Sequence, residues 1–193
     1  PKNFENYTTN FKKALNIGVY GTDLCYLYLY NQKDLAVSVF RSIKQLAEEL
    51  NITNALNSRE VHHIEQQLHN QDSLIHLLGA TYRKFDQYLS ENQRHKMGAL
   101  IVAGGWIESN YLLSQTIKTH HDRYLINRLG EQKHTLDNLI ELLSSYYYES
   151  ERYTRLIDAL VDLAYEFDGV IYNYYYKESV VREEEQLSII RSS

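Results

Sequence analysis

Proline and cysteine are almost missing from this 193-residue chain, which has one of each, Pro1 and Cys25. A proline inside a helix removes a main-chain donor and clashes with the preceding turn, so a chain without internal proline can form long helices. A single cysteine excludes an internal disulfide, a cysteine-rich zinc site and a Cys-x-x-Cys redox pair. The two absences favour an all-α fold that noncovalent packing alone holds together.

Positive charge is also in the minority, because 20 Lys and Arg stand against 25 Asp and Glu, for a net charge of −5. Nucleic-acid binding needs basic surfaces that neutralise phosphates, so nucleic acid is not an expected partner. Long apolar runs are missing too, since the most apolar stretch, 98–107, is half the roughly 20 residues that span a membrane. We therefore expect one soluble helical domain over residues 1–193.

Apolar residues recur at helical spacing along most of the sequence. The spacing predicts helices over about 11–29, 33–50, 58–89, 95–118 and 123–143, and a sixth from about 151. Ser90 and Gln93 have the spacing of a capping box ahead of the fourth helix. That helix contains small residues at 98, 99 and 103–105, which weaken a helix and are expected to allow a close backbone approach. The expected fold class is an all-α bundle of about six helices.

The two halves of the sequence are weakly similar to each other. At one common offset, Ala14, Leu15, Tyr26 and Leu27 align with Ala99, Leu100, Tyr111 and Leu112. The same offset aligns Asp23 with Glu108. An internal duplication over 11–91 and 96–180 would give two pseudo-symmetric three-helix halves whose acids face each other; the alternative is a chance match between helical patterns.

Three segments carry a resemblance to a known family: "ALNIGVYGTDLCYL", "AGGWIESNYL" and "EQKHTLDNLIELL". Together they resemble an uncharacterised family of exported, often lipid-anchored, all-helical bacterial proteins, and the resemblance covers most of the chain. It implies a location in the periplasm or at the outer membrane, and no known activity. The expected partner is a small ligand or an envelope protein. Membrane contact is expected only through a lipid anchor that this chain does not contain.

Asp23 and Glu108 are the candidate polar centre, because each lies in the middle of an otherwise apolar predicted helix. A buried carboxylate must be hydrogen-bonded, paired with a cation, bound to metal or protonated. The side chains expected around the two acids are Tyr20, Tyr26, Trp106 and Tyr111. One hypothesis is that these six residues line a ligand site of a binding module without a cofactor. The other is structural: tyrosine hydroxyls, the Trp106 N–H or a nearby arginine satisfy the acids and fix the helix register.

A third hypothesis is a carboxylate-bridged dimetal centre, as in ferritin-like oxidoreductases. Such bundles use one acid from each of two helices and a Glu-x-x-His motif from each of two others. The pieces in this sequence are the lone acids Asp23 and Glu108 and the pairs Glu60–His63 and Glu131–His134. Both pairs fall off the apolar rows of their helices, on faces expected to meet water, which makes this hypothesis the least favoured. The motifs of common hydrolases, zincins and nucleotide-binding proteins are absent from the sequence.

Overall fold

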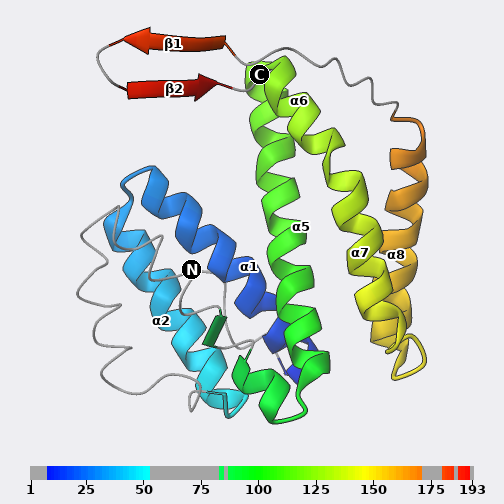
Figure 1. The fold of residues 1–193 in the computed structure, drawn as a ribbon. Coiled ribbons are helices and arrows are strands. Elements are labelled where there is room, and N and C mark those ends of the chain that lie inside the picture. Colours follow the sequence, from blue (N-terminus) through cyan, green and yellow to red (C-terminus); the bar gives the residue numbers. More distant parts are fainter. Residues whose placement is uncertain (1–7, 53–82, 85–86, 171–179, 185–186, 192–193) are drawn as a thin grey trace.

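Helices form most of the computed structural model, which describes residues 8–52, 83–84, 87–170, 180–184 and 187–191 (Figure 1). The bundle consists, within these ranges, of α1 (Asn10–Leu29), α2 (Lys33–Glu49), α5 (His95–His120), α6 (Arg123–Gly130), α7 (Gln132–Ser144) and α8 (Glu151–Asp168). The predicted all-α bundle of about six helices is confirmed. Most of the helix predicted over 58–89 lies outside the described residues, although 87–91 are helical. The internal duplication stays a prediction.

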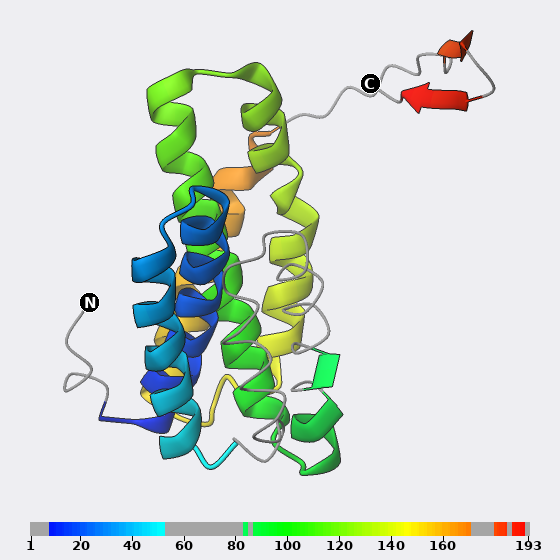
Figure 2. The same cartoon turned by 90° about the vertical axis from the view of Figure 1, so that its left-hand side faces the viewer.

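The longest helix, α5, is the centre of the arrangement (Figure 1). The hairpin of α1 and α2 lies on one side of α5, and α6, α7 and α8 lie on the other, as the view turned by 90° also shows (Figure 2). Contacts join α1 to α5 and α2, α5 to α6 and α7, and α7 to α8. Beyond the helices, β1 (Val180–Glu184) and β2 (Leu187–Arg191) pair as an antiparallel hairpin, which the sequence analysis did not predict.

Two clusters of buried side chains hold the helices together. The larger one draws on five helices. Among its members are Ala14, Ile17 and Tyr20 of α1, Leu46 and Ala47 of α2, Ala99, Leu100, Ala103 and Trp106 of α5, Leu136, Leu139 and Leu143 of α7, and Tyr153, Ile157 and Leu160 of α8. The smaller one joins α1 to α2 through Leu24, Tyr28, Ala36 and Phe40. The first half of α1 is therefore packed in the main core, and its second half is held by α2. No helix within the described ranges has the length and apolar content to cross a membrane.

Local side-chain bonds explain where several helices begin and end. The Thr9 hydroxyl accepts a hydrogen bond from the Lys12 main-chain N–H at the start of α1, over 3.3 Å. Asp122 caps α6 in the same way, accepting from the Tyr124 N–H over 2.8 Å. Between α5 and α6 the chain reverses at His121, which adopts a left-handed conformation with φ of 48°. These are the usual ways of satisfying the unpaired main-chain groups at helix ends.

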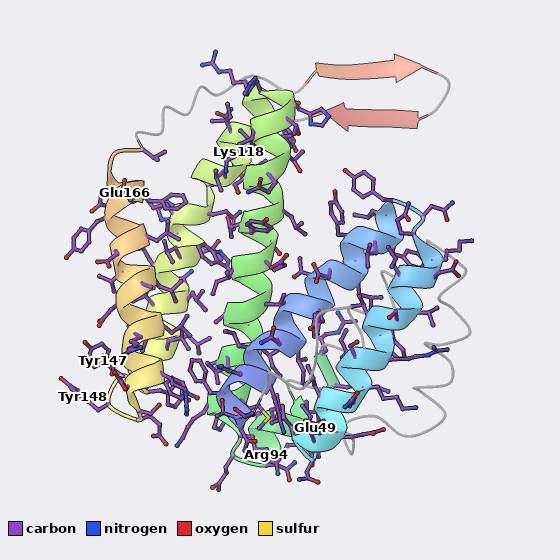
Figure 3. The ribbon with its side chains drawn as sticks, turned by 180° about the vertical axis from the view of Figure 1, so that it is seen from behind. Glu49, Arg94, Lys118, Tyr147, Tyr148 and Glu166 are labelled. Atoms are coloured by element: carbon purple, nitrogen blue, oxygen red, sulfur yellow. The ribbon has the colours of Figure 1, made fainter. Side chains whose placement is uncertain are left out.

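The capping box predicted from Ser90 and Gln93 is wrong, because the residue that precedes α5 is Arg94. Its side chain turns to the end of α2 instead. The Arg94 guanidinium donates to the carbonyl oxygens of Leu50, over 2.9 Å, and of Asn51, over 3.1 Å. A cation at the carboxyl end of a helix donates hydrogen bonds to free carbonyl groups and interacts favourably with the negative end of the helix dipole. Figure 3 shows Arg94 and Glu49 at this same end of the molecule.

The single helix predicted over 123–143 is also wrong, since two helices, α6 and α7, occupy this region. The break falls where α6 ends at the buried residue Gly130. Glycine destabilises a helix by about 1 kcal/mol relative to alanine, which favours a helix end here. Leucines continue at helical spacing on both sides of Gly130, so the apolar pattern alone predicts one uninterrupted helix.

Candidate functional site

The helices α1 and α5 come into direct backbone contact where they cross. A Cβ atom added to Gly18 would lie 2.0 Å from the Ile101 carbonyl oxygen. A Cβ atom added to Gly104 would lie 1.9 Å from the Leu15 carbonyl oxygen. No real Cβ atom can occupy either position, so the two backbones touch directly. The close approach predicted from the small residues of α5 is thus present at Gly104, whereas Gly98 has room for a side chain, with its nearest neighbour 3.7 Å away.

Polar groups continue this contact along the helices. The Thr22 hydroxyl donates to the Gly105 carbonyl oxygen over 3.1 Å and lies 3.4 Å from the Ser109 hydroxyl. The Ser109 hydroxyl also donates to the Gly105 carbonyl oxygen, over 2.8 Å. We call these contacts the α1–α5 seam, which comprises Leu15, Gly18 and Thr22 of α1 and Ile101, Gly104, Gly105 and Ser109 of α5. Since later residues of α1 meet later residues of α5, the two helices run in the same direction, as Figure 1 also shows.

Asp23 and Glu108 flank the far end of the seam. Asp23 follows Thr22 directly, Glu108 precedes Ser109 directly, and the axial rise of a helix is about 1.5 Å per residue. The two acids therefore lie at nearly the same level of two parallel, touching helices. Both are half-buried, and each has an interaction partner within the protein.

The four aromatic residues predicted around the acids divide into two pairs. Tyr20 and Trp106 are 5% and 9% exposed and belong to the larger core cluster. Tyr26 and Tyr111 are 37% and 55% exposed, on the surface of α1 and α5. The Tyr26 ring packs against the Tyr30 ring in a tilted arrangement, with centroids 4.5 Å apart. Partial burial, followed by the effect of Tyr30, raises the pKa of Tyr26 above its usual value.

Trp106 and Glu108 are two residues apart on α5 and so project roughly 200° apart around the helix axis. The structure therefore does not bring the Trp106 side chain to the acids. The surface pair Tyr26 and Tyr111 lies one turn beyond Asp23 and Glu108 on the respective helices. Asp23, Glu108, Tyr26 and Tyr111 remain the candidate ligand site, and ligand binding there stays a prediction.

The dimetal hypothesis finds no support in the described part of the chain. Glu60 and His63 lie outside the described residues. Within the described ranges, no three His, Cys, Asp or Glu side chains form a group that could hold a metal ion. Glu131 and His134 are both exposed, and Glu131 is occupied by an ion pair with Arg128, over 2.7 Å.

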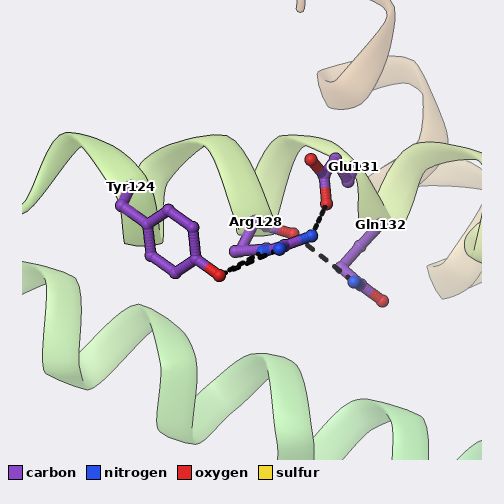
Figure 4. A network of polar contacts seen from close by, with 4 residues as sticks. All are labelled: Tyr124, Arg128, Glu131 and Gln132. Carbon is purple, nitrogen blue, oxygen red and sulfur yellow. Dashed lines mark hydrogen bonds and ion pairs between the residues drawn. The ribbon is translucent and has the colours of Figure 1, made fainter. Parts of the chain in front are cut away.

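Arg128 is the centre of a surface network between α6 and α7 (Figure 4). Its guanidinium donates to the Tyr124 hydroxyl from Nε over 3.0 Å and from Nη2 over 2.9 Å, and it lies 4.9 Å from the centroid of the Tyr124 ring. The Gln132 amide donates to the Arg128 carbonyl oxygen over 3.4 Å. The hydrogen bonds with Tyr124 and Glu131 raise the pKa of Arg128. This network joins the end of α6 to the start of α7, which is a structural role for Glu131.

Two features of α5 are not evident from the sequence. The hydroxyl of Ser109 belongs to the seam, which only the position of α1 reveals. Asn110 is placed by a hydrogen bond that its Nδ2 donates to the Trp106 carbonyl oxygen over 2.8 Å. A small polar residue four positions after an aromatic one gives no signal of its own, so neither residue could be found without the fold.

Comparison with known proteins finds no matching family model, no matching curated protein and no matching solved structure.

Proposed function

We propose that the chain is a binding module of the bacterial envelope that holds a small cationic ligand beside the α1–α5 seam, between Asp23 and Glu108. The envelope location derives from the sequence resemblance alone. One observation supports the binding role. The half-buried Asp23 and Glu108 lie at about the same height along two helices that run in the same direction and are in contact.

Electrostatics supports a cation as the ligand. Two carboxylates at one level of a half-buried surface contribute a negative potential there, which attracts a positively charged group. The exposed rings of Tyr26 and Tyr111, one turn further on, add aromatic faces that attract cations by about 0.5–1 kcal/mol at exposed sites. A primary amine, a polyamine or a basic side chain of an envelope protein has this chemistry.

A titration with spermidine tests the proposal. Trp106 is the only tryptophan of the chain and is buried in α5, so its fluorescence reports changes in this helix without labelling. We expect a saturable change at constant ionic strength, and at least a tenfold loss of affinity in Asp23→Asn and in Glu108→Gln, since a charge-assisted bond contributes about 1.5–3 kcal/mol.

The matched controls are Asp137→Asn and Glu141→Gln, which make the same changes at exposed positions of α7. They should leave the affinity unchanged. Equal losses in the control and seam variants would reduce the effect to general attraction by an acidic protein, and a titration without saturation would refute the binding role.

The structural role of the acids is the second candidate, because each already has an interaction partner within the protein. In that case Asp23→Asn and Glu108→Gln lower the free energy of unfolding in urea, with no spermidine binding to lose. If the chain binds spermidine through these acids, the opposite result is expected. The two variants then lose the spermidine-dependent fluorescence change, and their free energy of unfolding changes less.

A further inference from the structure

Trp106 and Asn110 each carry a buried polar atom that lacks a hydrogen-bond partner among the described residues. The atoms are Trp106 Nε1 and Asn110 Oδ1. Trp106 is only 9% exposed, and its N–H is out of reach of solvent. Both residues project roughly 200° away from Glu108 around α5, because each is two positions from it. They therefore form a polar pair that is separate from the α1–α5 seam.

The orientation of the Asn110 side chain is fixed by its own helix. Its Nδ2 donates to the Trp106 carbonyl oxygen over 2.8 Å, and the reverse orientation would place two acceptors against each other. The Asn110 Oδ1 atom is thus turned away from that carbonyl group and is available as an acceptor. Trp106 Nε1 can only donate. One donor and one acceptor therefore lie on the same face of α5, one helical turn apart.

Such a pair is expensive to leave unsatisfied. A buried donor or acceptor without a partner costs about 1–3 kcal/mol, and more than nine in ten such groups in folded proteins are paired. Trp106 and Asn110 are four positions apart on α5, so their side chains leave the same face of the helix one turn apart and are neighbours on it. A single hydroxyl or amide group that accepts from Trp106 and donates to Asn110 would satisfy both atoms.

The side chains around Trp106 indicate the chemistry of a molecule that could bind there. Trp106 shares the larger core cluster with Leu136 and Leu139 of α7 and Leu160 of α8, so the neighbourhood is apolar. A charged group would have no opposite charge from this pair and would be strongly disfavoured. A buried water molecule makes two to four hydrogen bonds, so a single water is the competing occupant of this pair, and the test below distinguishes the two. An apolar molecule with one neutral polar group matches an apolar wall with two polar atoms.

We propose that Trp106 Nε1 and Asn110 Oδ1 anchor an interior site for a small neutral molecule that carries an amide or hydroxyl group. This site goes beyond the cation site at the seam and does not depend on it. Spermidine tests the cation site at the seam and a neutral amide tests the interior site, so the failure of one proposal does not affect the other.

The single tryptophan makes the test direct, because the ¹⁵N-labelled full-length chain gives one indole N–H resonance. The probe is N-methylacetamide, with acetate and methylammonium as charged molecules of similar size. We expect a saturable shift of the indole resonance with N-methylacetamide and none with the charged probes. In Asn110→Leu the affinity should fall about tenfold, as expected for the loss of one hydrogen bond. Asn138→Leu, at an exposed position of α7, is the matched control and should bind like the wild type.

Three results would overturn the site. They are an indole resonance that does not respond to the amide, an unchanged affinity in Asn110→Leu, and a long-lived nuclear Overhauser contact between water and the indole that persists through the titration. The last result would assign the pair to a bound water molecule. If Asn110→Leu does not fold, Trp106→Phe asks the same question by calorimetry: the rise in Tm that the amide gives the wild type should be lost.

Discussion

The Thr22 hydroxyl of α1 donates a hydrogen bond to the Gly105 carbonyl oxygen of α5 over 3.1 Å. A side chain as short as threonine reaches the main chain of a neighbouring helix only where the two helices nearly touch. The hydrogen bond therefore indicates the same close approach of α1 and α5 that Gly18 and Gly104 show. Thr22 precedes Asp23 directly, so this contact places Asp23 near the part of α5 that carries Glu108.

Replacing Thr22 by valine should lower the free energy of unfolding by only about 0.5–1 kcal/mol. Valine keeps the shape and removes the hydroxyl, and the Gly105 carbonyl oxygen keeps the bond from Ser109, so no buried acceptor is stranded. Urea unfolding measures the difference, with Thr22→Ser as the control that retains the hydroxyl. A loss above about 2 kcal/mol would mean that the hydroxyl does more than this geometry implies.

Alanine at Gly18 or Gly104 should be far more damaging. The new Cβ atom would lie about 2 Å from a main-chain carbonyl oxygen, so α1 and α5 must move apart, and overpacking of this kind typically costs about 1–3 kcal/mol or more.

Gly21→Ala is the matched control for these variants, because it lies on the same helix with nothing within 4 Å of its added Cβ atom. It should raise the free energy of unfolding by up to about 1 kcal/mol through helix propensity alone. If all three variants gained stability alike, the two backbones would not be in contact.

Stability should fall in alkaline solution because of Tyr153. Burial, followed by the charges of Glu149 and Tyr146, raises the pKa of this phenol to about 12. The unfolded chain loses the same proton near pH 10, so between pH 10 and 12 the folded state binds more protons and stability declines as pH rises. At about 1.4 kcal/mol per pH unit the full loss is on the order of 2–3 kcal/mol.

The variant Tyr153→Phe should remove this part of the pH dependence, measured as the free energy of unfolding at pH 9 and pH 11. Tyr165→Phe, at a position 70% exposed on α8, should retain it. Parallel pH profiles for the wild type and Tyr153→Phe would contradict the assignment.

The sequence predicted α1, α2 and α5 well because each signal was local: apolar periodicity, and the turn at 120–122. The division between α6 and α7 was missed since the leucine rows mask the effect of Gly130. Asp23 and Glu108 became candidate site residues because each is a charged residue within an otherwise apolar helix, and their role in binding stays a prediction. Trp106 was grouped with the acids although it is two positions from Glu108, a spacing that places the two side chains on roughly opposite faces of a helix. Asn110 and Ser109 gained their roles only from tertiary contacts.

The central claim, that α1 and α5 run parallel in contact with Asp23 and Glu108 at one level, is tested most directly by a disulfide between Thr22→Cys and Ser109→Cys in a Cys25→Ser background. The two hydroxyl oxygens are 3.4 Å apart, and sulfur atoms in their places need approach by little more than 1 Å to reach the bond length of about 2 Å. We expect near-complete cross-linking within the monomer on oxidation, and none when Asn16→Cys replaces Thr22→Cys. Free thiols in the first variant, or equal cross-linking in both, would contradict the account.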